Sequence, residues 1–213
     1  VADEIVDFSN YCLEQGADAV MILPPYYFRF GAEALLQYYD RLAGKINGPI
    51  YIYNFPANTG TSVPAETVLQ LAQMHPNIVG IKEASGDMSY AMKIARCVGP
   101  DFALYSGNDD ITVPLMSIGG SGVISVYANV MPAMCHQIVD DYLHGRQDQA
   151  VANHLKYLQL MNDLFLEVNP IPVKTAMNLL GLNVGPMRLP LCEMAEKNKA
   201  VLKAAMERAG LLK

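Results

Sequence analysis

A lysine at the end of an apolar segment is the residue of this chain best suited to covalent chemistry. Residues 77–81 (Asn-Ile-Val-Gly-Ile) have the composition of a buried β-strand, and Lys82 follows them directly, before the polar residues 83–87. Burial disfavours the ammonium form of a lysine, so the amine at such a position becomes a usable nucleophile toward a carbonyl carbon. This segment alone leaves open the alternative that Lys82 extends into solvent from the strand end.

A tyrosine in a second segment is a possible proton-transfer partner for this lysine. Residues 49–54 (Pro-Ile-Tyr-Ile-Tyr-Asn) also predict a buried strand, and polar and turn residues follow it. Tyr53 is expected at the end of that strand, where its hydroxyl could meet the Lys82 amine and shuttle protons. The alternative is an ordinary sheet tyrosine, which is how we interpret Tyr51.

The two segments contain motifs that are specific when taken together. Residues 53–60 read Tyr-x-x-Pro-x-x-Thr-Gly, and residues 80–87 read Gly-Ile-Lys-Glu-Ala-Ser-Gly-Asp. In these motifs the chain resembles the dihydrodipicolinate synthase/N-acetylneuraminate lyase family, which consists of pyruvate-handling class I aldolases with a (β/α)8 barrel. The resemblance implies that Lys82 forms a Schiff base with pyruvate and that Tyr53 relays protons. It also implies that Tyr27 reaches across a dimer interface into a neighbouring site, although a buried aromatic is the alternative for Tyr27.

The resemblance further implies a set of substrate-binding residues. The backbone carbonyl of Ile124 would face pyruvate, and the turn beside Tyr53 would contribute Asn58, Thr59 and Gly60. Gly107 and Asn108 would end their strand near the aldehyde pocket, and a plain turn is the alternative for them. The protonated imine serves as the electron sink in such enzymes, so no metal and no organic cofactor is expected.

One residue separates the chain from the synthases that it otherwise resembles most. Those enzymes condense pyruvate with aspartate semialdehyde in lysine biosynthesis, as 4-hydroxy-tetrahydrodipicolinate synthases, and use an arginine where this chain has Asn58. Residues 106–110, 122–130 and 167–174 resemble the synthases, whereas residues 56–60 resemble 4-hydroxy-2-oxoglutarate aldolases. We therefore expect the synthase reaction. The alternatives are a 4-hydroxy-2-oxoglutarate, 2-keto-3-deoxy sugar acid or N-acetylneuraminate aldolase, or a non-catalytic paralogue that retains Lys82 by descent.

Helix-like and strand-like segments alternate along the chain, which predicts an α/β fold with a parallel sheet. The expected strands are 19–23, 50–54, 78–82, 102–106 and 122–126. The expected helices are 2–15, 32–42, 64–74, 88–97, one ending near 118, 132–143, 147–166, 170–180 and 190–210. This gives five β/α units, so the resemblance implies a (β/α)8 TIM barrel that lacks its first three units and continues into a C-terminal helical extension.

The resemblance also sets the expected organisation. Residues 1–131 would hold barrel strands four to eight with their helices, and residues 132–213 the last barrel helix and the extension, within one structural domain. Because the absent units would carry a threonine of the proton relay and close the barrel, we expect this sequence to be a fragment of a longer enzyme.

Composition restricts the partners of the chain. Apolar residues make up 52% of its 213 residues and charged residues 17%, with a net charge of −6, which argues against a nucleic-acid surface. Neither a membrane span nor a signal peptide is visible, and the four cysteines and four histidines lack zinc-site spacing. We expect a cytoplasmic homodimer or homotetramer whose partners are pyruvate and an aldehyde.

Overall fold

The structure is a computed structural model that describes residues 2–97 and 99–212, and these residues form two compact units. The first unit comprises residues 1–107 and 114–122, and the second comprises residues 108–113 and 123–213. The organisation of the chain as one structural domain that divides at residue 131 stays a prediction.

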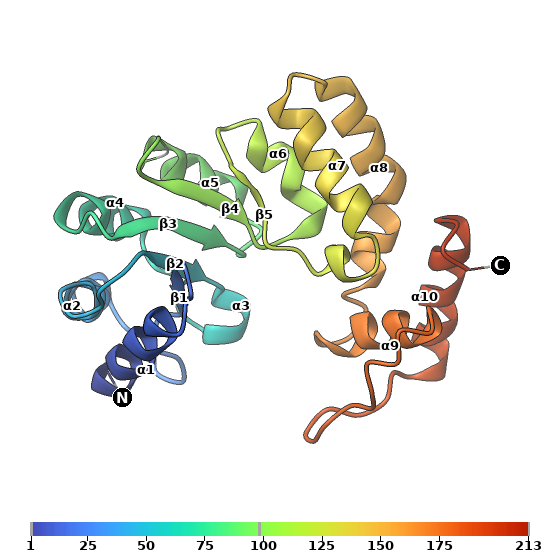
Figure 1. Ribbon diagram of the computed structural model, residues 1–213, viewed down its shortest axis with the longest axis horizontal. Coiled ribbons are helices and arrows are strands. Elements are labelled where there is room, and N and C mark those ends of the chain that lie inside the picture. The colour runs from blue at the N-terminus through green and yellow to red at the C-terminus, as the bar shows by residue number, and fades with distance from the viewer. Residues whose placement is uncertain (1, 98, 213) are drawn as a thin grey trace. The chain divides into compact units, whose positions relative to one another are not determined.

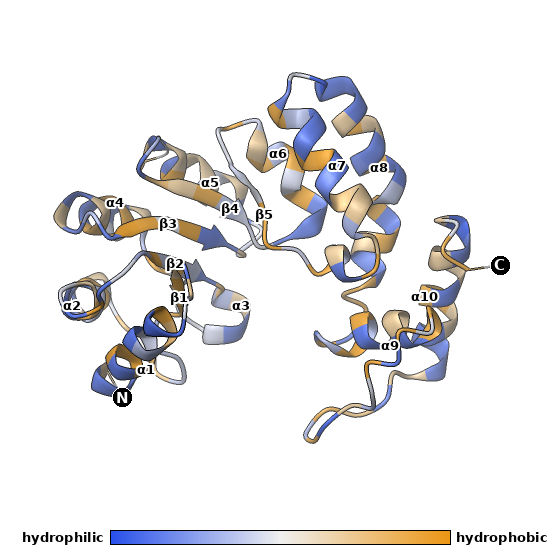
Figure 2. Ribbon diagram, in the orientation of Figure 1, coloured by the Kyte–Doolittle hydropathy of each residue, from blue (hydrophilic) through white to orange (hydrophobic). Residues whose placement is uncertain are grey.

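In the described residues, five strands form one sheet in chain order (Figure 1). They are β1 (Val20–Ile22), β2 (Ile50–Asn54), β3 (Ile78–Glu83), β4 (Ala103–Ser106) and β5 (Gly122–Val123). The pairs from β1 to β4 are parallel, which confirms the predicted α/β fold with a parallel sheet. Strand β3 is hydrophobic for most of its length and becomes hydrophilic at its carboxyl end (Figure 2), where Lys82 and Glu83 lie.

Helices cover one face of the strands in the first unit. They are α1 (Ala2–Glu14), α2 (Ala32–Ala43), α4 (Ala65–Met74) and α5 (Met88–Ile94), which continues into the 3-10 turn η1 (Ala95–Cys97). Each α-helix of this set packs against the next. Their apolar side chains bury the outward residues of the strands, such as Ile52, Ile81 and Leu104, which have no exposed surface.

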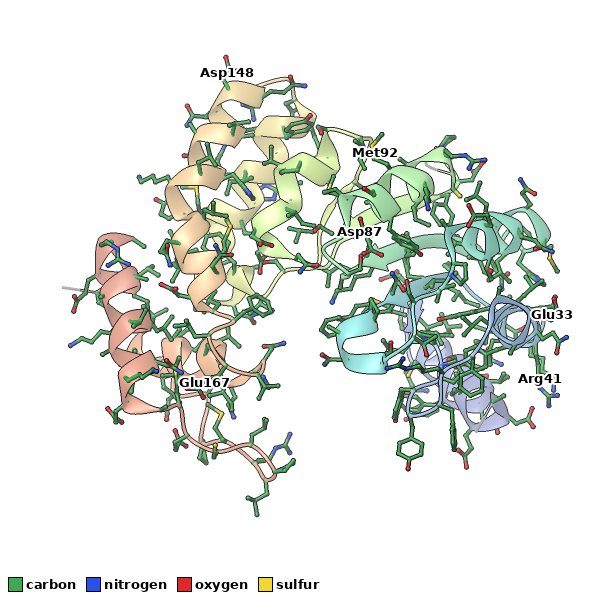
Figure 3. The ribbon with its side chains drawn as sticks, turned by 180° about the vertical axis from the view of Figure 1, so that it is seen from behind. Glu33, Arg41, Asp87, Met92, Asp148 and Glu167 are labelled. Atoms are coloured by element: carbon green, nitrogen blue, oxygen red, sulfur yellow. The ribbon has the colours of Figure 1, made fainter. Side chains whose placement is uncertain are left out.

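Two polar contacts fix the ends of these helices. The carboxylate of Asp87, labelled in Figure 3, accepts hydrogen bonds from the N–H groups of Ser89 (2.8 Å) and Tyr90 (3.2 Å), so it caps the N-terminus of α5. Arg41 near the end of α2 forms a 2.8 Å ion pair with Asp3 of α1, on the solvent side of both helices. The pair is exposed, so its contribution to stability is small.

The second unit is helical and has its own core. It contains η3 (Tyr127–Asn129), α7 (Pro132–Leu143), α8 (Gln147–Asp163), α9 (Ile171–Leu179) and α10 (Glu196–Arg208). Side chains from all these elements meet in one buried cluster that includes Tyr127, Ile138, Leu160, Ala176 and Met206. The short elements η2 (Asp109–Ile111) and α6 (Thr112–Met116) follow β4 in the chain. No helix in the part of the chain that the structure describes is both long and apolar enough to span a lipid bilayer.

The prediction of a helix over 190–210 is wrong in its first part, because α10 begins only at Glu196. The residues before it are held by side chains instead of by a helical ladder. Lys174 donates to the carbonyl of Pro186 at 2.6 Å, and Glu167 (Figure 3) accepts from the N–H of Ala195 at 3.0 Å. The predicted helix over 147–166 ends three residues early, at Asp163.

The prediction of a strand over 122–126 is also wrong in its second half, because β5 ends at Val123. The cause is the buried carboxylate of Asp109. It accepts from the Ser125 hydroxyl and from the N–H groups of Val126 (3.0 Å) and Tyr127 (2.9 Å). Backbone groups that bond to this side chain are unavailable for a strand ladder, so the chain turns into η3.

Candidate active site

The face of the sheet that no helix covers carries the side chains that could take part in a reaction. Side chains alternate along each strand, so the residues that do not enter the helix-covered core lie together on the other face. In the register of the strands, Tyr53 of β2 is opposite Lys82 of β3, and Lys82 is opposite Tyr105 of β4. All three side chains are half-buried. Tyr53 and Lys82 are therefore cross-strand neighbours, and their catalytic roles stay predictions. Tyr105, which sequence reasoning missed, lies on the other side of Lys82.

The Lys82 amine lies close to the Tyr53 ring. Its Nζ is 4.2 Å from the ring centroid, a cation–π distance, and the Tyr53 ring also stacks on Phe55 with centroids 5.5 Å apart. Burial raises the pKa of the Tyr53 phenol above 10.0, so the hydroxyl is protonated at neutral pH and can donate. The contact that the geometry gives is with the face of the ring, and the expected meeting of hydroxyl and amine stays a prediction.

A glycine makes room for two further tyrosines on this face of the sheet. Tyr51 and Tyr105 approach with ring centroids 5.9 Å apart, at 64° to each other. They can do so because Gly80, opposite Tyr51 in register, has no side chain, and a Cβ there would lie 2.6 Å from the Tyr51 ring. The apolar strand interrupted by a glycine is the sequence signal that could have revealed this close approach.

The loop after β2 forms a short helix that the sequence did not predict. Helix α3 (Pro56–Thr59) ends at Gly60, whose φ of 70° is left-handed and favours glycine. The Thr59 hydroxyl is buried and bonds to the carbonyl of Thr61 at 2.8 Å, so it holds the turn together. Asn58 is exposed on this helix. The substrate-binding roles of Asn58, Thr59 and Gly60 stay predictions.

A buried polar pair lies behind Lys82 on the helix-covered face. Glu83 is 1% exposed and Asn54 has no exposed surface, and they are opposite each other in register, one residue beyond the Tyr53–Lys82 pair. Asn54 Nδ2 donates to Glu83 Oε2 at 2.7 Å, and the Ser85 N–H donates to Glu83 Oε1 at 2.6 Å. Burial raises the pKa of the Glu83 carboxyl, and the hydrogen bonds from Ser85 and Asn54 oppose that rise. Sequence reasoning assigned no role to either residue.

Tyr27 lies in a different setting from Lys82, in the loop after β1. Its side chain is 87% exposed, so the alternative of a buried aromatic is wrong. Its φ of 81° is left-handed, which costs a tyrosine of order 1–3 kcal/mol. The ring packs edge-on against Phe28 at 4.9 Å. Tyr26 and Phe30 of the same loop border an apolar groove with Phe8 and Met21. An exposed, strained aromatic in such a place is consistent with the predicted role of Tyr27 at an interface.

The remaining candidates follow β4 and β5. Gly107 donates its N–H to the Glu83 carbonyl at 2.7 Å, and a Cβ on Gly107 would lie 2.5 Å from that of Ala84, so close packing requires this glycine. Asn108 and Ile124 belong to the second unit, where Asn108 precedes η2 and Ile124 is 39% exposed directly after β5. The roles of all three in binding substrate stay predictions.

The second unit contains a buried carboxylate that bonds to the residues just after Ile124. Asp109 is 3% exposed and orders residues 125–127 through its three hydrogen bonds. Burial raises the pKa of its carboxyl group. Among residues 2–97 and 99–212, no group of three His, Cys, Asp or Glu side chains is arranged to hold a metal ion.

Known proteins resemble this chain over nearly its whole length. The profile of the Dihydrodipicolinate synthetase family matches residues 2–209. A 4-hydroxy-tetrahydrodipicolinate synthase of Thermoanaerobacter sp. (strain X514) is 47% identical over 208 residues, which are 98% of this chain and 70% of the relative. The crystal structure of dihydrodipicolinate synthase from Thermotoga maritima has a TM-score of 0.95 and 36% identity, over 99% of this chain and 72% of that one.

A second solved structure gives the same result. It is the lysine-bound enzyme from Cyanidioschyzon merolae, with a TM-score of 0.94 and 37% identity, and it covers all of this chain and 72% of that one. The α/β fold with its parallel sheet is therefore that of the dihydrodipicolinate synthase structures. Sequence and fold agree, and the chain belongs to the dihydrodipicolinate synthetase family.

Proposed function

We propose that this chain carries out a pyruvate-dependent aldol condensation, as a 4-hydroxy-tetrahydrodipicolinate synthase that joins pyruvate to aspartate semialdehyde. The observation that carries the proposal is the position of the Lys82 amine, 4.2 Å from the Tyr53 ring centroid on the uncovered face of the sheet. Relatives with 42–47% identity bear the name of this enzyme, which supports the same conclusion.

In the proposed reaction, Lys82 is the covalent nucleophile. The neutral amine attacks the C2 carbonyl of pyruvate to give a carbinolamine, which loses water to form an imine. Loss of a C3 proton gives an enamine, and its C3 forms the new bond to the aldehyde carbon, whose oxygen takes up a proton. Water, or the amino group of aspartate semialdehyde, then attacks the imine carbon, and Lys82 leaves as the free amine.

Tyr53 is proposed to move protons during these steps. The burial that raises the pKa of its phenol keeps the proton on the hydroxyl until a stronger base is formed at the carbinolamine or the aldol oxygen. Tyr27 is proposed to reach a neighbouring subunit of a homodimer or homotetramer, in support of which it is exposed and held in a strained backbone conformation.

The barrel itself is part of the proposal. We infer that residues 1–131 supply strands four to eight of a (β/α)8 barrel and that residues 132–213 supply the last barrel helix and a C-terminal extension. About three tenths of the Thermoanaerobacter relative has no counterpart in these 213 residues, and we propose that it corresponds to the first three β/α units. Asn108 and Ile124, with Gly107, are proposed to border the substrate site of that barrel.

Asn58 favours a second candidate within the same reaction class. Its neutral, exposed amide lacks the charge and the bidentate geometry with which a guanidinium binds a carboxylate. A 2-oxo-acid aldolase that takes an aldehyde without this carboxylate, such as glyoxylate or a neutral aldehyde, is therefore the alternative.

Chemical trapping tests the proposal. Borohydride added to the full-length protein with pyruvate is expected to reduce the imine and to attach a pyruvate-derived group to the peptide that contains Lys82. Product formation from pyruvate and aspartate semialdehyde is then measured against glyoxylate and a neutral aldehyde. A label on another lysine, such as Lys174, would show that Lys82 is not the nucleophile, and the absence of any label would identify a non-catalytic paralogue.

A further inference from the structure

The buried pair of Asn54 and Glu83 connects the two segments that form the proposed site. Asn54 ends β2, and its Oδ1 accepts from the N–H of Val63 at 3.0 Å and from the Ser62 hydroxyl at 3.4 Å. Its Nδ2 donates to Glu83, which directly follows Lys82. The pair therefore joins the far end of the 55–63 loop to the residue beside the nucleophile. This loop carries Asn58, Thr59 and Gly60.

Only one arrangement of donors and acceptors satisfies this pair. The N–H of Val63 fixes Asn54 Oδ1 as an acceptor, so Nδ2 has to face Glu83. The other Glu83 oxygen faces the N–H of Ser85 at 2.6 Å. Both oxygens of Glu83 therefore meet donors, and a carboxylate fits where a glutamine would set its NH₂ group against Asn54 or Ser85.

Backbone hydrogen bonds connect this pair to the strand end that carries Lys82. The Ala84 N–H donates to the Asn54 carbonyl at 2.9 Å and the Gly107 N–H donates to the Glu83 carbonyl at 2.7 Å. The end of β3 is thus held from β2 and from β4. Because successive residues of a strand point to opposite faces, fixing Glu83 on the covered face also fixes the direction of Lys82 on the uncovered face.

We propose that Asn54 and Glu83 are a positioning pair for the aldol reaction, which aligns the Lys82 amine and the 55–63 loop without touching substrate. The inference rests on the proposed function, since alignment of Lys82 matters only if Lys82 reacts. A misplacement of about 1 Å at a reacting group can cost roughly 100-fold in rate. Loss of either hydrogen-bond partner is therefore expected to act on kcat more than on KM for pyruvate.

A carboxylate–amide swap tests the pair. In Glu83→Gln, an NH₂ group faces a donor, and in Asn54→Asp, two carboxylates face each other across a gap that is now a 2.7 Å hydrogen bond. In the double variant, which combines Asn54→Asp with Glu83→Gln, the new carboxylate accepts from Val63 and from the new glutamine, whose oxygen accepts from Ser85. Every hydrogen bond of the pair is restored and the number of charges is unchanged. Glu66→Gln is the matched control, because it removes an exposed carboxylate of α4.

The readout is the rate of borohydride trapping at saturating pyruvate, with kcat and KM, on full-length proteins that circular dichroism shows to be folded. Each single variant is expected to slow trapping by about 10- to 100-fold, and the double variant to return within a few fold of the wild type. Glu83→Asp keeps the charge on a shorter side chain and is measured in case Glu83→Gln does not fold. Its trapping rate is expected to lie between those of the wild type and Asn54→Asp.

The outcomes separate this inference from the proposed function. If the wild type is labelled and both single variants trap pyruvate at the wild-type rate, the pair does not position Lys82, even if the variants melt earlier. If the single variants are slow and the double variant stays as slow, the hydrogen bonds are not what aligns the site. A wild type that takes no label overturns the proposed function, and the positioning role with it.

Discussion

Removing the Asp109 carboxylate is expected to destabilise the second unit more than any ordinary loop substitution. Asp109→Ala takes the acceptor from the Ser125 hydroxyl and from the N–H groups of Val126 and Tyr127, and Tyr127 is fully buried. Residues 125–127 would then have to adopt their turn without it. Asp110→Ala is the matched control, because the backbone carbonyl of Asp110, and not its carboxylate, accepts from His154 at 2.9 Å.

The size of the stability loss in Asp109→Ala follows from the N–H groups that lose their acceptor. A buried donor without an acceptor costs about 1–3 kcal/mol, and two backbone donors are affected. Removing a buried charge returns part of this, since burial disfavours the ionised form of Asp109, so we expect a net loss of ~2–4 kcal/mol. Asp109→Asn should lose only about 1 kcal/mol, because both N–H groups bond to the same oxygen, Oδ2, which an amide oxygen can replace.

The stability lost in Asp109→Ala should also depend on pH. The pKa of Asp109 in the folded chain is raised above 3.8 by burial, so the folded state holds this proton more tightly than the unfolded state does. The contribution of Asp109 to stability is therefore greatest below the unfolded pKa and declines as the pH rises through the folded pKa. The difference between the wild type and Asp109→Ala is expected to be larger at pH 4 than at pH 7.

Urea unfolding followed by far-UV circular dichroism measures these differences. A loss of ~3 kcal/mol with a slope of ~2–3 kcal/mol/M would move the unfolding midpoint by roughly 1 M. If Asp109→Ala unfolds at the same urea concentration as Asp110→Ala, the carboxylate does not order residues 125–127. If Asp109→Asn is as damaging as Asp109→Ala, the charge matters and the reasoning from the shared oxygen is wrong.

Three further predictions concern the uncovered face of the sheet and its loop. Tyr53→Phe should slow turnover by about 100-fold with little loss of stability, because the ring stays and only the proton donor is removed; a variant with near-normal turnover would exclude Tyr53 from the mechanism. Asn58→Arg should raise kcat/KM for aspartate semialdehyde roughly 10- to 100-fold relative to glyoxylate, and reduced use of both aldehydes would mean that another cation, such as Arg29, already binds the carboxylate. Gly80→Ala should lower stability by about 1–3 kcal/mol, since its Cβ would press on the backbone carbonyl oxygen of Ala103 and lie 2.6 Å from the Tyr51 ring; an unchanged melting temperature would show that both the strand and the ring move aside freely.

Much of the sheet could be predicted from the sequence because local patterns decide it. The first four strands are apolar runs that end in polar or turn residues, and their bounds lie within one or two residues of those expected. That Tyr53 and Lys82 could lie near each other was expected from the same pattern, since two parallel strands that end together bring their end residues side by side.

Two of the errors share a cause, which is a side chain distant in sequence that bonds to the backbone. Asp109 bonds to residues 16 to 18 positions further along the chain and so ends β5 early. Glu167 accepts from the N–H of Ala195, which is 28 positions further along. Helix α3 was missed because a stretch with proline and glycine predicts a turn as readily as one helical turn. Neither the partner of Glu83 nor its burial could be read from its own segment, because both depend on the β2–β3 register.

The donor and acceptor pattern of Asn54 and Glu83 also limits how these two positions can change in evolution. A single change at either one sets two donors or two carboxylates against each other, whereas the exchange of both restores every hydrogen bond. The path between the two solutions runs through an impaired intermediate, so the positions are expected to covary. In an alignment of homologues that keep the neighbouring lysine, asparagine should occur with glutamate and aspartate with glutamine. Frequent mixed pairs would show that surrounding residues can compensate.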